Sequence, residues 1–159
     1  MTVYLVAPKS GAGYRLNNTE ILDAATLDGW LDTAQATLPG VLTVIVDADD
    51  AQTFMQGIAP DGGQTRFLVA STDVDENASF GLGGEVSFSR FFWNQTLNGA
   101  RLRQAFQVAR RAINLTQNAQ LDVDGNGVPN QITDALVVDD YFIGSGVALA
   151  GDDPFVSEV

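Results

Sequence analysis

Oxygen-bearing side chains gather between residues 122 and 134 at the spacing of a calcium-binding loop. Asp122 and Asp124 offer carboxylates, and Gly127 stands at the sixth position of the loop, where the chain must turn sharply. Calcium prefers oxygen ligands, backbone carbonyls included. The predicted ligands are Asp122, Asp124, Asn126, the carbonyl of Val128, Asn130 and Asp134.

The closing position of this loop departs from both the EF-hand and the dockerin pattern. Thr133 stands at the twelfth position, where an EF-hand carries a bidentate glutamate, and Asp134 follows one residue later. The expected calcium affinity is therefore weak. The same residues also fit a turn rich in Asp, Asn and Gly that binds no ion, and the sequence leaves both interpretations open.

A second group of acidic residues follows two strand-like segments, 41–46 and 65–70. These acids are Asp47, Asp49 and Asp50 after the first segment, and Asp73, Asp75 and Glu76 after the second. Parallel strands would bring them to one rim, together with Pro8. Two carboxylates there could share a proton and act as an acid–base pair, or several could hold a cation. The simpler interpretation is a set of solvated loop acids, with Asp47 bonded to nearby backbone amides.

The elements that must position these residues alternate between strand and helix. Apolar runs predict strands at 2–7, 41–46 and 65–70, with a last short strand at 141–143. Helices are expected at 23–38, 51–57, 87–98 and 100–115. The order predicts an α/β fold, in which a mostly parallel sheet of about four strands carries helices on both faces. Residues 1–150 would form this domain, and residues 151–159 an acidic, flexible tail.

Two of the helices carry clear patterns. Asp23 and Ser87 can cap the N-termini of the helices that follow them. Apolar stripes are expected to face the core. They consist of Leu27, Trp30, Leu31, Ala34 and Leu38 in the helix at 23–38, and of Leu102, Ala105, Phe106, Ala109 and Ile113 in the helix at 100–115.

Several short motifs, in this order, resemble the legumain-like branch of the caspase–hemoglobinase fold of cysteine peptidases. They are the strand at 2–7 followed by Tyr14-Arg15-Leu16, Val46-Asp47-Ala48-Asp49 followed by Phe54, Ala70-Ser71-Thr72, Ser87-Phe88-Ser89-Arg90-Phe91-Phe92, the helix from Gly99 to Ala109, and Gln120-Leu121-Asp122 with Asn126-Gly127. The resemblance implies a caspase-like α/β domain. It also implies that only the C-terminal part of that domain is present, without the family's first two strands.

The resemblance places a histidine where Pro8 stands and a cysteine where Asp49 stands. The chain contains no Cys and no His, so the thiolate–imidazole chemistry of such peptidases is excluded. The resemblance then implies a non-catalytic, pseudopeptidase-like domain that acts as a structural or binding module. The alternative is an inactivated form or a fragment of a legumain-like cysteine peptidase, which is a hydrolase.

Charge and patterning limit the partners. With 20 acidic and 8 basic residues the net charge is −12, which opposes binding to nucleic acid or to an anionic membrane surface. The strand at 2–7 is apolar on both faces, yet the chain offers little to pair on one of its sides. An open sheet edge that binds a protein partner or a second copy is therefore expected. The acidity and the calcium-like loop favour a secreted or extracytoplasmic location.

Overall fold

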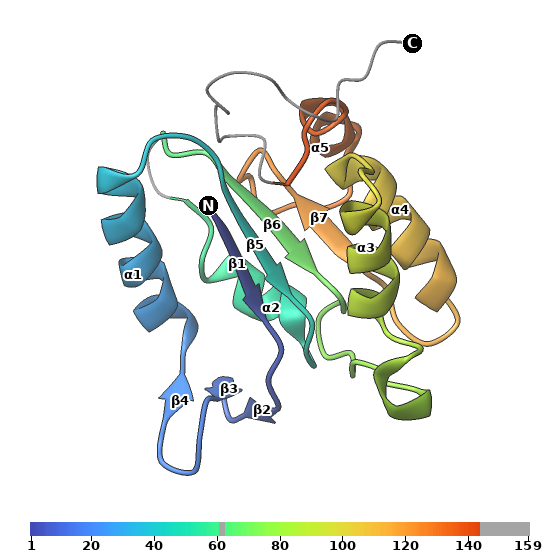
Figure 1. Cartoon of the computed structure of the whole chain (residues 1–159). Coiled ribbons are helices and arrows are strands. Elements are labelled where there is room, and N and C mark those ends of the chain that lie inside the picture. The colour runs from blue at the N-terminus through green and yellow to red at the C-terminus, as the bar shows by residue number, and fades with distance from the viewer. Residues whose placement is uncertain (61–62, 144–159) are drawn as a thin grey trace, which may run out of the picture.

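A four-stranded sheet forms the centre of the computed structural model, which describes residues 1–60 and 63–143 (Figure 1). Its strands are, in spatial order, β1 (Thr2–Leu5), β5 (Leu42–Val46), β6 (Arg66–Ala70) and β7 (Gln120–Asp122). The first three are parallel, and β7 runs antiparallel to β6. The predicted α/β class and the mostly parallel sheet are thus confirmed. The tail predicted at 151–159 lies outside the described residues.

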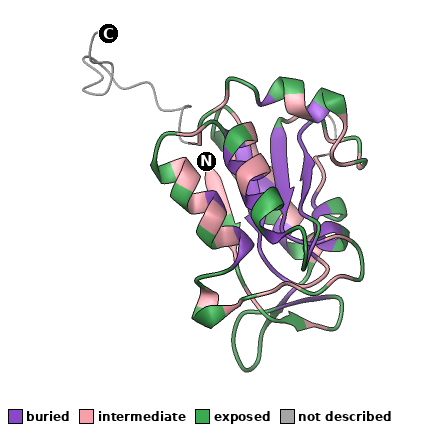
Figure 2. Cartoon of the chain, turned by 90° about the vertical axis from the view of Figure 1, so that its right-hand side faces the viewer, coloured by how far each residue is buried: buried purple, intermediate pink, exposed green. Residues whose placement is uncertain are grey.

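Helices cover both faces of the sheet, as expected. Alternate residues of β5 divide between two cores: Val44 and Val46 pack with residues of α1 (Ala24–Thr37) and α2 (Ala51–Gln56), and Ile45 with residues of α3 (Phe88–Leu97) and α4 (Leu102–Ile113). Every residue of β5 and β6 is buried, and Figure 2 shows these strands enclosed between the helices. Burial on both faces explains why the two strands are continuous apolar runs.

The predicted caps and one of the two stripes are confirmed. The Asp23 carboxylate accepts from the amide of Thr26 at 2.7 Å, and the Ser87 hydroxyl accepts from the amide of Arg90 at 3.2 Å. All five residues of the α4 stripe are buried. In α1, Leu27 and Leu31 are buried, but the inclusion of Trp30 and Leu38 was wrong, since they are 58% and 50% exposed.

The reason for the different orientation of α1 is a buried arginine. Arg66 in β6 has no exposed side-chain surface, and its guanidinium donates to Asp28 at 2.6 Å and to Asp32 at 2.8 Å. It also donates to the side chain of Gln35 at 3.0 Å and to the carbonyl of Ile58 at 2.6 Å. The polar side of α1 therefore faces the sheet beside Leu27 and Leu31, which turns Trp30 toward solvent.

The fourth strand lies elsewhere in the chain than expected. The strand predicted at 141–143 was wrong, and the position beside β6 is taken by β7 at Gln120–Asp122. Tyr141 instead packs its ring edge-to-face on Phe67, with 4.8 Å between the ring centroids, and its carbonyl accepts from the amide of Leu102. The short turn after α4 delivers β7 to the sheet edge before the chain reaches Tyr141.

A small antiparallel sheet, not predicted, lies beyond the carboxyl end of β1. It consists of β2 (Lys9–Ser10), β3 (Gly13–Arg15) and β4 (Ile21–Leu22). Gly13 has no space for a side chain, because a Cβ there would collide with the carbonyl of Leu22. The sheet buries Tyr14, whose hydroxyl donates to the carbonyl of Asp49 at 2.9 Å. It thereby connects the loop after β1 with the loop after β5.

Two short helices complete the described chain: the 3₁₀ helix η1 (Leu82–Gly84) and α5 (Ile132–Val137). None of the described helices is both long and apolar enough to cross a bilayer.

Candidate functional site

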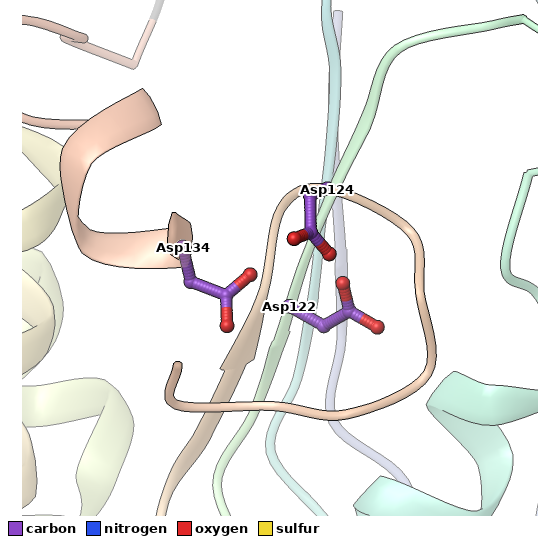
Figure 3. A group of neighbouring side chains, drawn as sticks. All are labelled: Asp122, Asp124 and Asp134. Atoms are coloured by element: carbon purple, nitrogen blue, oxygen red, sulfur yellow. The ribbon is translucent and has the colours of Figure 1, made fainter. Parts of the chain in front are cut away.

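Three carboxylates of the predicted calcium loop converge in the structure. Asp122 ends β7, Asp124 lies in the loop that follows, and Asp134 lies in the first turn of α5 (Figure 3). One carboxylate oxygen of each residue lies within 4.8 Å of those of the other two. Asp122 and Asp134 are buried, and Asp124 is exposed. The arrangement joins the end of a strand to the start of a helix through acidic side chains.

Asp134 is fixed in place by two backbone amides. One of its oxygens accepts from the amide of Gln131 at 2.8 Å, and the Gln131 side chain accepts in return from the amide of Asp134, which forms a capping box at the start of α5. The other oxygen accepts from the amide of Val123 at 2.9 Å. The residue therefore holds α5 against the end of β7, apart from any role as a ligand.

Asp122 is fixed by the loop itself. Its two oxygens accept from the amides of Gly125 and Gly127, each at 2.8 Å. Both glycines have a positive φ, +71° and +76°, which the loop requires to turn its amides toward the carboxylate. Burial raises the pKa of Asp122; the two amides lower it and the charges of Asp134 and Asp124 raise it further, with a net raised value. A bound cation would offset the repulsion between these carboxylates.

The other predicted ligands occupy different surroundings. Asn126 lies next to Asp124, to which its amide group donates at 3.0 Å, while its own oxygen accepts from the amide of Val128. Asn130 directs its amide group to the carbonyl of Ala119 and to Gln120. Its side-chain oxygen is buried and has no hydrogen-bond partner among the described residues. Of the six predicted ligands, the structure thus brings together the three acids as a cluster, with Asn126 beside them.

Pro8 and Asp49, the positions compared with the peptidase histidine and cysteine, line one cavity at the carboxyl ends of β1 and β5. Its volume is about 460 Å³, and it is lined by Val6, Ala7, Pro8, Ala48, Asp49, Ala78 and Phe80. Asp49 is the one polar residue among these lining residues, and one oxygen of its carboxylate accepts from the amide of Ala78 at 2.8 Å. Phe80 was missed because it lies in an irregular segment without periodicity.

The acids expected at the rim are Asp47, Asp49, Asp50, Asp73, Asp75 and Glu76. They lie close to one another in the chain, but they bond to other groups rather than to each other's carboxylates. Asp50 accepts from Lys9 at 2.6 Å and from the amide of Asp75 at 2.9 Å. Burial raises the pKa of Asp50, but the hydrogen bonds from Lys9, Thr53 and Asp75 outweigh it and leave the pKa below its ordinary value. Among the described residues no hydrogen bond joins two of the rim carboxylates, so nothing in the geometry supports a shared-proton pair.

The Asp47 carboxylate bonds to the start of α3 rather than to the loop that follows β5. One of its oxygens accepts from both the amide and the hydroxyl of Ser89, in the first turn of α3. The expected bond to a backbone amide is present, but the amide belongs to Ser89, 42 residues away, because the side chain leaves the end of β5 toward the α3 face of the sheet. A buried carboxylate at a helix N-terminus is favoured by the amides and the dipole there. The residue therefore anchors α3.

No family model matches this chain, and no curated protein matches it in sequence. The resemblance to legumain-like peptidases accordingly stays a prediction that rests on the short motifs and their order.

Proposed function

We propose that loop 122–134 binds calcium, and that the domain around it is a non-catalytic structural or binding module. The observation that carries the cation site is the convergence of Asp122, Asp124 and Asp134, two of them buried. Among the described residues no Lys or Arg forms an ion pair with any of the three. A divalent cation would offset the repulsion between these charges.

Calcium fits this loop better than magnesium does. Calcium accepts six to eight oxygen ligands in irregular geometry, whereas magnesium demands a near-ideal octahedron and keeps much of its water. The loop offers carboxylates and amide oxygens in an irregular arrangement and lacks a closing bidentate glutamate. Binding of the weaker, extracellular type follows, with Kd values of about 10⁻⁴ to 10⁻³ M. Such a site suits a secreted or extracytoplasmic setting.

Thermal unfolding in chelator and in calcium tests this proposal. Calcium at about 10 mM should raise the midpoint, because a ligand at about 10 to 100 times its Kd adds about 1.4 to 2.7 kcal/mol to the free energy of unfolding. Magnesium should have a smaller effect. Asp124→Asn should weaken the calcium response, since it removes one negative charge from the cluster and keeps an oxygen there, and Glu85→Gln, at an exposed acid outside the loop, should retain the full response. An unchanged midpoint in calcium would refute the site.

The pseudopeptidase interpretation is the second part of the proposal. What supports it is that Pro8 and Asp49 line the same cavity, as the resemblance to a peptidase active site requires. Acyl transfer needs an activated nucleophile and a base beside it. Proline has no titratable group, and a carboxylate is a poor acyl acceptor without a base, so this cavity is suited to binding alone.

The competing interpretation is an inactivated form or a fragment of a legumain-like cysteine peptidase. The double variant Pro8→His with Asp49→Cys separates the two. We expect both this variant and the parent chain to leave peptide substrates uncut. Cleavage by the double variant, lost again on alkylation of the new cysteine, would favour the hydrolase.

A further inference from the structure

The outer edge of β1 is unpaired in the described part of the chain. The carbonyls of Met1 and Leu5 accept from the amides of Thr43 and Asp47, both at 2.9 Å. The backbone amides and carbonyls of the odd-numbered residues of β1 therefore point toward β5. By the alternation of an extended strand, the amides and carbonyls of Thr2, Tyr4 and Val6 point the other way. Within the described residues no hydrogen bond involves any of those groups. The edge is therefore a template for a further strand.

Side-chain contacts hold the strand at this edge, and it lacks the features that usually block pairing with another strand. Tyr4 donates its hydroxyl to Ser89 and packs edge-to-face on Trp93, with 5.2 Å between the ring centroids. The segment from Thr2 to Leu5 contains no charge, proline or bulge, which are the features that commonly block edge-to-edge pairing. Tyr4 and Val6 remain 42% and 48% exposed. An added strand would cover apolar surface as well as satisfy backbone groups.

The free edge runs directly into the cavity at the strand ends. Val6 follows Leu5 directly, and together with Phe80 it lines the cavity of about 460 Å³. Asp49 is the one acidic residue of that lining. Among the described residues it accepts a single hydrogen bond, from the amide of Ala78. A segment that pairs with β1 would extend over apolar walls with a negative charge among them.

We propose that an extended segment of another protein adds as a strand to the free edge of β1 and places a Lys or Arg side chain in this cavity. The methylene stem would contact Val6 and Phe80, and the cationic head would meet the Asp49 carboxylate. The net charge of −12 favours a basic segment and opposes a second copy of this chain. The inference rests on the binding-module part of the proposed function and is independent of calcium.

Selection from a library of random decapeptides against the whole chain tests this inference. Enriched peptides should carry Lys or Arg at one fixed position, flanked by β-branched and aromatic residues. When such a peptide binds, the amides of Thr2, Tyr4 and Val6 should gain protection from hydrogen exchange. Replacement of the basic residue by norleucine should weaken binding roughly tenfold, the usual loss for one charge-assisted hydrogen bond. That loss should disappear in Asp49→Asn.

Two variants at one position separate pairing from side-chain contact. Val6→Pro removes an amide that faces the free edge, so the fold should tolerate it while peptide binding falls roughly tenfold. Val6→Ala keeps the amide and should weaken binding less. A calorimetric melt checks that both variants are folded, and the Asp49→Asn comparison stands without them.

Several results would overturn the inference. No enrichment, equal binding by Val6→Pro and the parent, or peptides without a basic residue would each contradict it. Concentration-dependent protection of the same amides without peptide, with a dimer in light scattering, would assign the edge to a second copy. A calcium response in the absence of peptide binding would refute this inference and leave the cation site intact, so the two proposals fail separately.

Discussion

Replacement of Arg66 by alanine should destabilise this fold more than any change at a surface ion pair. The Arg66 side chain is fully buried, and its guanidinium joins β6 to α1 through Asp28, Asp32 and Gln35. The substitution removes all of these bonds together with the one to the carbonyl of Ile58. It also leaves a cavity where the side chain lay, so the loss is large.

The size of this loss depends on how far Arg66 and its aspartate partners are buried. Breaking a buried ion pair costs about 3–5 kcal/mol when the remaining charge stays buried. Here the aspartates are 25% and 40% exposed and recover some hydration, which lowers the cost. The lost hydrogen bonds, at about 0.5–3 kcal/mol each and not additive, keep it high. We expect Arg66→Ala to lower the free energy of unfolding by about 3–4 kcal/mol.

Urea unfolding measures this loss, provided that the m-value is unchanged. Asp32→Asn, at the more exposed partner, should cost about 1 kcal/mol. Arg90→Ala removes a solvent-exposed pair with Glu85 and should change stability by less than about 0.5 kcal/mol. If Arg66→Ala costs no more than Arg90→Ala, the buried network does not hold α1 to the sheet and the reasoning is refuted.

Two further predictions concern carboxylates at the strand ends. Asp47→Asn should lower the free energy of unfolding by about 1–2 kcal/mol, because the charge-assisted bonds to Ser89 at the start of α3 become neutral; an unchanged urea midpoint would contradict this. The pKa of Asp50 is lowered in the folded chain, so its stabilising contribution is complete above the unfolded value of about 3.9 and is lost as the pH falls through the lowered folded value. Lys9→Met should raise the titration midpoint of the Asp50 carboxyl carbon in NMR, and a midpoint that stays in place would show that Lys9 does not hold this carboxylate.

Much of the central architecture could be predicted, because buried strands and helices carry recognisable apolar patterns in their sequences. The strands β5 and β6 are buried on both faces and read as unbroken apolar runs, and α4 shows a helical stripe because its whole inner side packs on the sheet. Ser87 and Asp23 marked helix starts through their capping chemistry. These signals are local, so they need no knowledge of neighbouring elements.

Other features depend on contacts between residues far apart in the chain, which leave no local pattern in the sequence. The strand β7 is three residues long and ends in Asp122, a loop acid, so it shows no strand pattern of its own. The orientation of α1 follows from Arg66, which lies 31 residues or more from its helix partners. A signal existed in the polar spacing of Asp28, Asp32 and Gln35, which share one side of a helix, but an apolar stripe competed with it.

The same limits apply to the candidate site. Proximity of Asp122 and Asp124 follows from loop spacing, whereas the position of Asp134 depends on how α5 returns to β7. The proximity of Pro8 and Asp49 could be predicted from parallel strands that end at one rim, but the cavity between them could not. Phe80, which completes its wall, had no signal, because its segment folds through tertiary contacts alone.

Isothermal titration of calcium into the chelator-treated chain tests the proposed cation site most directly. We predict saturable binding of a single calcium ion per chain that is weakened in Asp124→Asn, which removes one of the three charges, and kept in Glu85→Gln. Absence of any saturable heat, or binding that survives Asp124→Asn unchanged, would contradict a calcium site in loop 122–134 and leave that segment an ion-free turn.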